Sequence, residues 1–379
     1  MNDFYEFLNL RIKSRRKKKL SSPVVISTRI RLARNLDRFI FSTRYSKEQK
    51  QEIYEEVKNV LSELSVFDKG INWEMNNLKK LEKKILVERH LISQELSKQK
   101  AGSGVYINKK ENLSVMINEE DHIRMQNVVD GYFFKKAFTG INKLDNEIEK
   151  RLSYAFQLPY GYLTSCPTNV GTGMRASAML HLPGLVSTNQ MDKVVRAIGQ
   201  LGMIVRGWLG EGSDASGSIF QISNQQTLGE DERTIITRLD AVFQTIIEQE
   251  INAREILFEK DRYKLMDKFG RSYGVLNYGR VINSSECMNL LSMMRLAVDM
   301  GFLPERTRSI IDRLFIEIQP GHVLAIAGVN EGNNDVRDFL RSNYIARELR
   351  KIPEPDEQYG DSPEPDDNRF SEKKVIFKQ

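Results

Sequence analysis

The stretch Ser165-Cys166-Pro167-Thr168-Asn169-Val170-Gly171-Thr172-Gly173-Met174-Arg175-Ala176-Ser177 places a thiol, hydrogen-bonding side chains, glycines and an arginine in one short segment. Glycine lets backbone N–H groups approach an anion closely, because it has no Cβ. The planar guanidinium of arginine forms paired hydrogen bonds with phosphate oxygens. The combination favours phosphoryl transfer; the alternative is a glycine-rich loop that only leads into a helix.

Three more segments share this bias toward arginine, glutamate and tight backbone: Ser27–Arg31, Asn118–Arg124 and Arg206–Gly212. In chain order, the four segments resemble the catalytic domain of the phosphagen (guanidino) kinases, the family of arginine and creatine kinases. The resemblance runs from about Pro23 to about Arg254. It implies an α+β fold with a curved antiparallel sheet flanked by helices, and transfer of a phosphoryl group from ATP to a guanidinium nitrogen.

Two glutamates and a cysteine match the residues that bind the guanidino substrate in this family. Arginine is protonated at physiological pH, so carboxylates must hold its guanidinium and help remove a proton. Glu120 and Glu211 match the family's substrate-binding glutamates, and we expect Glu120 to be the principal base. Cys166 matches the family's cysteine beside the guanidinium. The alternatives are a solvated acidic turn around Glu120 and a buried apolar role for the cysteine.

The phosphate side needs permanent positive charge, because negative charge spreads over several oxygens in the transition state. Five arginines match the family's nucleotide clamp, although any one of them, taken alone, is more often a surface salt bridge. Alternation from Val24 to Arg31 predicts a strand that projects Arg29 and Arg31 on one face. Mg²⁺ is expected on the ATP phosphates, with no metal ligand from the protein. The residues expected at the nucleotide site are Ser27, Thr28, Arg29, Ile30, Arg31, His90, Arg124, Arg175, Ala176, Ser177, Ala178, Met179, Arg206, Gly207, Trp208, Leu209, Gly210 and Glu211.

The chain also departs from the phosphagen kinases. In that family a helical domain precedes the catalytic domain and helps to enclose a small substrate. Here the resemblance begins at Pro23, close to the first residue, so we expect a more open site that an arginine on a protein could enter. Ile107 and Met179 stand where the family has two histidines near the adenine, which makes the adenine contacts less certain than the phosphate contacts.

A motif in the last part of the chain narrows the resemblance. Arg337-Asp338-Phe339-Leu340-Arg341-Ser342 resembles the RDxxRA motif of the bacterial protein-arginine kinases, with Ser342 in place of alanine. The resemblance implies a second, regulatory site at which Arg337, Asp338, Arg341 and Ser342 bind phosphoarginine. Arg337 and Arg341 are four residues apart and share one helix face. A solvated charged helix is the alternative.

This closer resemblance also implies partners. They are proteins with accessible arginines, an McsA-like activator, a Clp ATPase, a heat-shock repressor and a second copy of the chain in a homodimer. We therefore expect a protein-arginine kinase that marks proteins for Clp-type proteolysis. The alternatives are a kinase for free arginine or another small guanidino compound, and a non-catalytic adaptor that only reads phosphoarginine.

Composition limits the remaining possibilities. The 379 residues are 40% hydrophobic, which is enough for a sizeable core. No long apolar run or signal peptide is present, and Cys166 and Cys287 suggest no disulfide framework, so we expect a cytoplasmic protein without membrane contact. The net charge of +6 includes a basic run at 15–19. Without a recognisable DNA or RNA motif, this charge does not indicate direct nucleic-acid binding.

Four regions are expected: a basic segment at 1–22, a catalytic domain at 23–254, a helical domain at 255–352 and an acidic, disordered tail at 353–379. Residues 104–107 and 113–117 read as a hairpin. Apolar spacing predicts a helix whose face extends from Leu144 to Phe156, a long helix from Asp231 to Phe258, and a Met-rich helix from Ser284 to Met300.

Overall fold

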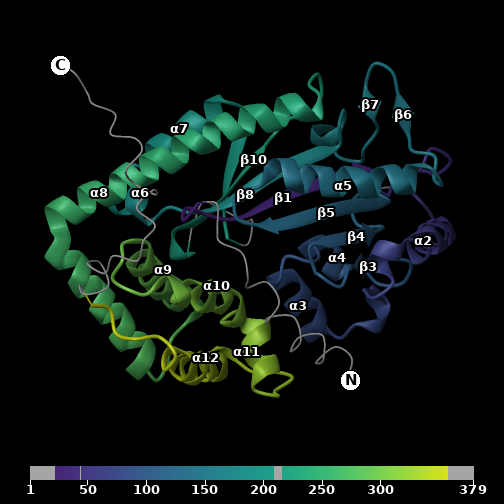
Figure 1. The fold of residues 1–379 in the computed structure, drawn as a ribbon. Coiled ribbons are helices and arrows are strands. Elements are labelled where there is room, and N and C mark those ends of the chain that lie inside the picture. Colours follow the sequence, from purple (N-terminus) through teal and green to yellow (C-terminus); the bar gives the residue numbers. More distant parts are fainter. Residues whose placement is uncertain (1–21, 43, 209–215, 357–379) are drawn as a thin grey trace, which may run out of the picture.

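An eight-stranded antiparallel sheet forms the centre of the molecule (Figure 1). The computed structural model describes residues 22–42, 44–208 and 216–356; the basic segment at 1–21, the expected site residues Leu209, Gly210 and Glu211, and the tail from 357 onward lie outside this part. In sheet order the strands are β2 (Ile71–Glu74), β3 (Gly104–Ile107), β4 (Leu113–Ile117), β5 (Ile123–Asp130), β1 (Val25–Arg34), β8 (Met174–His181), β10 (Ile219–Asn224) and β9 (Met203–Gly207). A separate hairpin joins β6 (Phe156–Gln157) to β7 (Gly161–Tyr162).

Helices surround the sheet and make up most of the last part of the chain. The predicted α+β fold, with an antiparallel sheet and a mainly helical C-terminal region, is confirmed. No helix in the described ranges combines the length and apolar character needed to cross a membrane. The helices are α2 (Lys47–Ser62), α3 (Lys80–Glu88), α4 (Gln94–Lys98), α5 (Phe134–Glu149), α6 (Pro183–Ser187), α7 (Met191–Gln200), α8 (Glu232–Tyr278), α9 (Ser284–Asp299), α10 (Arg308–Glu317), α11 (Pro320–Ile326) and α12 (Asn334–Leu349).

One face of the sheet is completely covered. Side chains alternate between the faces of a strand, and on β1 the residues Ile30 and Leu32 point into the largest core. Helices α2, α5 and α7 and the first part of α8 pack their apolar sides on this face. Burying this apolar surface provides most of the stabilisation of the sheet and its helices, because the hydrophobic free energy is proportional to the apolar area removed from water.

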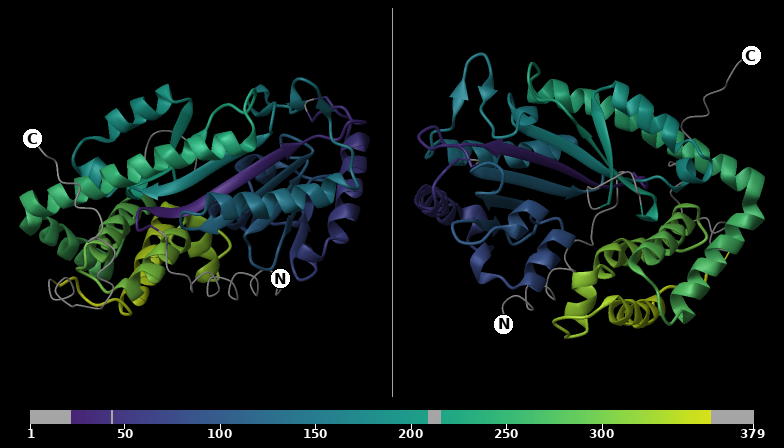
Figure 2. Two further views of the ribbon diagram at one scale, coloured as in Figure 1. Left: turned by 45° about the horizontal axis from the view of Figure 1, so that its top comes forward. Right: turned by 180° about the vertical axis from the view of Figure 1, so that it is seen from behind.

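The opposite face is covered only at its two ends. Helices α3 and α4 pack against β3 and β4 through a small core that includes Leu86 and Val105. At the other end, Met179 and Ile219 join a core built mainly from α9, α10 and α12. Helix α8 runs along the sheet and then turns down beside these C-terminal helices (Figure 2), with non-helical backbone angles at Asp261. The middle of this face, on β5, β1 and β8, carries polar side chains.

Asp299 joins the catalytic half to the C-terminal helices. Its carboxylate lies at the end of α9 and accepts hydrogen bonds from Arg254 Nη1 of α8 at 2.7 Å, from Arg295 Nη1 at 3.4 Å and from Arg308 at the start of α10. Burial opposes ionisation, but the three arginines hold the pKa of Asp299 below its ordinary value. Arg254 also donates to the carbonyl oxygen of His181 at the end of β8, which ties the cluster to the sheet.

The predicted elements are largely confirmed, with two differences. The hairpin of β3 and β4 and the helix α9 lie where expected. The long helix is interrupted at Asp261, close to the predicted end at Phe258, and a second helical part then continues to Tyr278. The helix expected through Phe156 ends at Glu149, so that prediction is wrong for about its last two turns. Backbone hydrogen bonds from Ala155 N to the carbonyl oxygen of Asn35 and from Leu163 N to that of Ala155 replace helical bonds there.

Replacing Asp299 with asparagine should destabilise the protein by about 3 to 5 kcal/mol, because it removes the buried carboxylate that three arginines share. Denaturant unfolding measures this loss. The matched control is Asp267→Asn, since Asp267 and Arg271 form an exposed pair with side chains 58% and 76% accessible. That control should change the free energy of unfolding by no more than about 0.5 kcal/mol. Equal effects of the two substitutions would contradict the structural role of Asp299.

Candidate active site

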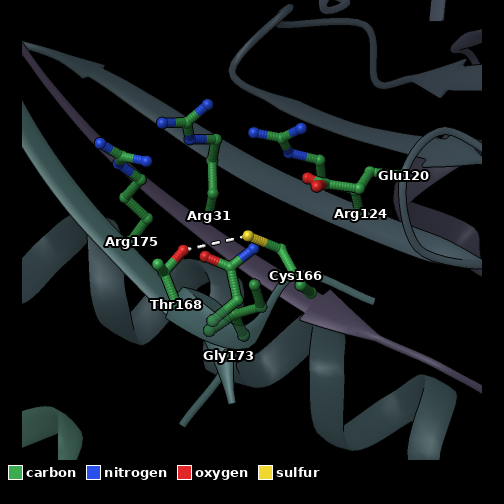
Figure 3. Close-up of a pocket in the computed structure, with 10 residues that line it drawn as sticks. Arg31, Glu120, Arg124, Cys166, Thr168, Gly173 and Arg175 are labelled. Atoms are coloured by element: carbon green, nitrogen blue, oxygen red, sulfur yellow. Dashed lines mark hydrogen bonds between the residues drawn. The ribbon is translucent and has the colours of Figure 1, made fainter. Parts of the chain in front are cut away.

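Three arginines from neighbouring strands form a row across the open middle of the sheet. Arg31 on β1 is paired with Arg175 on β8, and Ala33 of β1 is paired with Arg124 on β5. All three arginine side chains line one pocket and point into the same region (Figure 3). The predicted projection of Arg29 and Arg31 on one face is confirmed by the alternating burial of β1. Strand pairing therefore holds like charges side by side.

Burial and mutual repulsion lower the pKa values of Arg29, Arg31 and Arg175. Burial, then Arg124 and Arg175, lowers the pKa of Arg29 to about 10. Burial, then Arg206 and Arg124, lowers the pKa of Arg175 to about 10. The pKa of Arg31 is lowered well below its ordinary value, and its buried Nε has no hydrogen-bond partner in the described part of the chain. With pKa values of about 10, Arg29 and Arg175 remain cationic at neutral pH, so this face of the sheet is suited to a polyphosphate.

Arg124 is the member of the row that is paired with a carboxylate. Its Nη1 lies 2.7 Å from both carboxylate oxygens of Glu119, which is fully buried. Burial opposes the shift, but Glu119 raises the pKa of Arg124. Glu119 also accepts from Ser93 Oγ at 2.5 Å and from Glu120 N at 2.9 Å. Sequence reasoning missed Glu119 as a positioning residue, although it lies inside the acidic segment that was singled out.

Glu120 lies at the rim of the same pocket, in the loop between β4 and β5. In Figure 3 its carboxylate lies between Arg124 and Cys166. Partial burial of the carboxylate, followed by the negative charge of Asp121, raises the pKa of Glu120. A carboxylate with a raised pKa is a stronger base than an ordinary glutamate, which is the property that proton removal from a guanidinium requires.

A buried hydrogen-bond network fixes the loop that carries Glu120 to the loop that carries Cys166. Asp121 Oδ1 accepts from Asn35 Nδ2 at 2.8 Å and from Ser165 N at 2.7 Å. Asn35 in turn accepts from His122 N at 2.9 Å. Asn35, at the end of β1, therefore joins both loops to the strand that presents Arg31. Neither Asn35 nor Asp121 was predicted, because the bonds join residues far apart in the chain.

Cys166 is partly exposed and begins the short 3-10 turn at Pro167–Asn169. Its sulfur lies 3.1 Å from Thr168 Oγ1, and both residues line the pocket (Figure 3). The chain then returns to β8 through Gly173, which has a φ of 63°. A Cβ at Gly173 would lie 2.6 Å from the carbonyl oxygen of Ala33, so this position requires glycine. The turn thus brings Cys166 and Arg175 to one pocket.

A second pocket lies farther along the same face. Five residues expected at the nucleotide site line it, together with Val128 and Gln221, which the sequence did not indicate: Ser27, Arg29, His90, Ser177 and Met179. Trp208 is buried against His90, with ring centroids 5.1 Å apart. Because side chains alternate, the side chains of four other expected residues point instead into the core: Thr28, Ile30, Ala176 and Ala178.

Arg206 lies on β9 opposite Gln221, and its charge reaches Arg175 across β10. Gly207, the last residue of β9, is buried. Ile107 lies in the core beneath α3 rather than at either pocket. The described residues include no group of three or more His, Cys, Asp or Glu side chains placed to hold a metal ion.

The predicted regulatory residues lie on α12, away from both pockets. Arg341 is buried and donates to the carbonyl oxygens of Ile318 and Ile282, each at 2.8 Å, and to Asp338. Ser342 Oγ donates to the carbonyl oxygen of Arg280 at 2.6 Å. Arg337 is only partly buried and donates to Asn334. The motif thus contains one arginine that holds the helix in place and one nearer the surface.

Two family models match consecutive parts of the chain. The C-terminal catalytic domain of ATP:guanido phosphotransferase matches residues 52–253. The C-terminal domain of the protein-arginine kinase McsB matches residues 262–360. The protein-arginine kinases of Bacillus cereus strains AH187 and AH820 and of Bacillus anthracis are each 44% identical over 331 residues, which cover 87% of this chain and 93% of the relative.

Solved structures show the same fold at lower identity. Lombricine kinase has a TM-score of 0.55 and 24% identity, covering 62% of this chain and 69% of that one. The duplicated taurocyamine kinase from Schistosoma mansoni, solved with transition state analog components, has a TM-score of 0.56 and 22% identity, covering 76% and 49%. These likenesses concern the fold, whereas the sequence matches identify the family. The chain belongs to the protein-arginine kinases, within the ATP:guanido phosphotransferases.

Proposed function

We propose that this chain transfers the γ-phosphoryl group of ATP to arginine side chains of proteins. The observation that carries the proposal is the pocket in which Glu120 and Cys166 face the row formed by Arg31, Arg124 and Arg175. A base and a row of cations thus line one small space. Such a space suits a reaction between a cationic nucleophile that must lose a proton and a polyanionic donor.

In the proposed reaction, Glu120 binds the guanidinium of the substrate and accepts one of its protons. The freed nitrogen lone pair attacks the γ-phosphorus of ATP, the N–P bond forms, and the bond to the bridging oxygen breaks to give ADP. Cys166 lies beside Glu120, where it can contact the same guanidinium. Glu211, the second expected carboxylate, falls outside the described residues and stays a prediction.

Arg31, Arg124 and Arg175 would hold the phosphates and stabilise the charge that spreads over their oxygens. The buried Arg31 Nε, which has no hydrogen-bond partner among the residues that the structure describes, is a donor that a phosphate oxygen would satisfy. Mg²⁺, bound to the phosphates of ATP, would neutralise further charge. We place the rest of the nucleotide in the second pocket, beside Arg29 and Ser177.

The wider role is proposed from family membership. It includes cytoplasmic location, an McsA-like activator, delivery of marked proteins to a Clp ATPase, action on a heat-shock repressor, and a homodimer. It also includes the second site for phosphoarginine on α12. There the structure favours Arg337 as the residue that meets a phosphate, since Arg341 already donates to Asp338 and two carbonyl oxygens. Arg341 would instead fix the position of α12 through its hydrogen bonds to the carbonyl oxygens of Ile318 and Ile282.

The direct test is incubation of the full chain with ATP, Mg²⁺ and a basic protein, followed by mass spectrometry that preserves acid-labile N–P bonds. Free arginine is assayed in parallel. Phosphoarginine should form on the protein and not on the free amino acid. Transfer to free arginine alone would show a small-molecule kinase. Transfer to neither, with the activator present as well, would leave an adaptor that reads phosphoarginine.

Glu120→Gln should lower the rate of transfer by about 10²- to 10⁴-fold, because it removes the base while keeping the shape. The base acts only when deprotonated, and its raised pKa places the acid limb of the wild-type rate profile at higher pH than an ordinary glutamate would. The variant should lack this limb. The matched control is Glu95→Gln, an exposed carboxylate on α4 with a side chain 65% accessible. Unchanged transfer by the Glu120 variant would reject its assignment as the base.

Arg337→Ala should weaken binding of a phosphoarginine peptide about tenfold or more, because a charge-assisted hydrogen bond is lost. Binding of ATP should be unchanged, since α12 lies outside both pockets. Titration calorimetry with each ligand measures both effects. Arg341→Ala should instead lower the unfolding temperature, because it leaves two buried carbonyl oxygens without their donor. Undiminished peptide affinity in the Arg337 variant would place the second site elsewhere.

A further inference from the structure

Strand β10 lies beside the arginine-bearing strands and contributes polar side chains to the same face. Gln221 stands between Met179 of β8 and Arg206 of β9, and Ser223 stands between Ser177 and Ile204. Both side chains are buried, Gln221 to 7% and Ser223 to 1% accessibility. Apolar residues occupy the alternate positions of β10, Phe220 and Ile222, and point into the main core. The two polar residues are therefore directed toward the pockets.

Each of these side chains holds one arginine. Gln221 Oε1 accepts a hydrogen bond of 2.7 Å from Arg29 Nη2. Ser223 Oγ accepts from Arg175 Nε at 3.2 Å and from Arg175 Nη2 at 3.1 Å. The acceptors are a carboxamide and a hydroxyl, which fix the direction of a guanidinium without adding negative charge.

Arginines that hold the fold together have different partners. Arg34 is paired with Asp145 at 2.6 Å, Arg254 with Glu250 at 2.6 Å, and Arg313 with Glu348. A carboxylate is the stronger partner for a guanidinium, because both groups are charged. Arg29 and Arg175 are therefore held less strongly by their neutral partners than they would be by a carboxylate. In return, their positive charge remains available at the pockets.

We propose that Gln221 and Ser223 are positioning residues that orient Arg29 and Arg175 for the nucleotide phosphates while leaving their charge uncompensated. A carboxylate at position 221 would form an ion pair with Arg29 and compete with the phosphates for it. An apolar side chain there would release Arg29 without neutralising it. The proposal rests on the proposed function, in that it takes the ligand of this face to be a nucleotide.

The test measures binding of ADP with Mg²⁺ to the full chain by titration calorimetry, independently of phosphoryl transfer. Gln221→Glu, which is almost isosteric, should weaken ADP binding by about tenfold or more. Gln221→Met should weaken it by less, because only orientation is lost. The control is Gln225→Glu, which adds the same charge at an exposed position just beyond β10. It should change affinity by less than about twofold, because exposed charges are screened.

The order of affinities decides the question. The proposal is supported if wild type binds ADP most tightly, Gln221→Met less tightly and Gln221→Glu least tightly. Equal affinities for Gln221→Glu and Gln225→Glu, or a weaker Gln221→Met than Gln221→Glu, would overturn it, as would a wild-type chain that does not bind ADP. If the expected order holds but no transfer to protein arginine occurs, the proposed function fails and this inference stands.

Thermal unfolding of each variant shows whether it is folded. If Gln221→Glu does not fold, variants of Ser223 test the proposal instead, because Ser223 accepts the hydrogen bonds of Arg175. Ser223→Ala should weaken ADP binding and Ser223→Thr, which keeps the hydroxyl, should restore it. Equal affinity of Ser223→Ala and wild type would overturn the proposal in that case.

Discussion

Repulsion among arginines is the constraint around which the catalytic half is built. Arg31, Arg124 and Arg175 lie side by side on one sheet face, and burial and mutual repulsion lower the pKa values of Arg31 and Arg175. A single flexible loop could not keep such groups together, since each side chain would turn away into water. Antiparallel strands remove that freedom, because the register of β1 fixes the arginines relative to β5 and β8. The extensive core on the opposite face supplies the stability that this arrangement costs.

The rest of the molecule packs around the sheet face that carries the arginine row and leaves its middle accessible. Helices α3 and α4 pack against one end of it and the C-terminal helices pack against the other. Asp299 is central to this support, because its carboxylate joins arginines from three helices and, through Arg254, the end of β8. The ion cluster around Asp299 and the row of arginines at the pocket are thus connected through one strand, β8, which begins at Met174 beside Arg175 and ends at His181.

The sequence predicted the features that depend on local pattern. The hairpin of β3 and β4, the alternation of β1 and the helix α9 follow from spacing of apolar residues, and Glu120, Cys166 and the arginines follow from recognisable segments. What the sequence could not provide were contacts between distant residues. Asn35, Asp121 and Gln221 are ordinary polar residues whose partners lie on other strands or loops. For the same reason the helix expected through Phe156 stops early, since pairing of Ala155 with Asn35 overrides local helical spacing.

Most buried arginines of this chain fall into two groups according to their hydrogen-bond partners. Arg124 is the exception, because it lines the pocket and is also paired with Glu119. Arg34, Arg254 and Arg341 are buried and neutralised by carboxylates, so they join elements and have little charge left for a ligand. Arg29 and Arg175 have neutral acceptors, and Arg31 keeps a buried N–H without a partner among the described residues. Net charge could not reveal this difference, because every arginine contributes equally to it. The distinction arises from folding, which brings carboxylates to some arginines and amide or hydroxyl oxygens to others. Arg29 and Arg175, which have the neutral acceptors, line the two pockets proposed for the nucleotide.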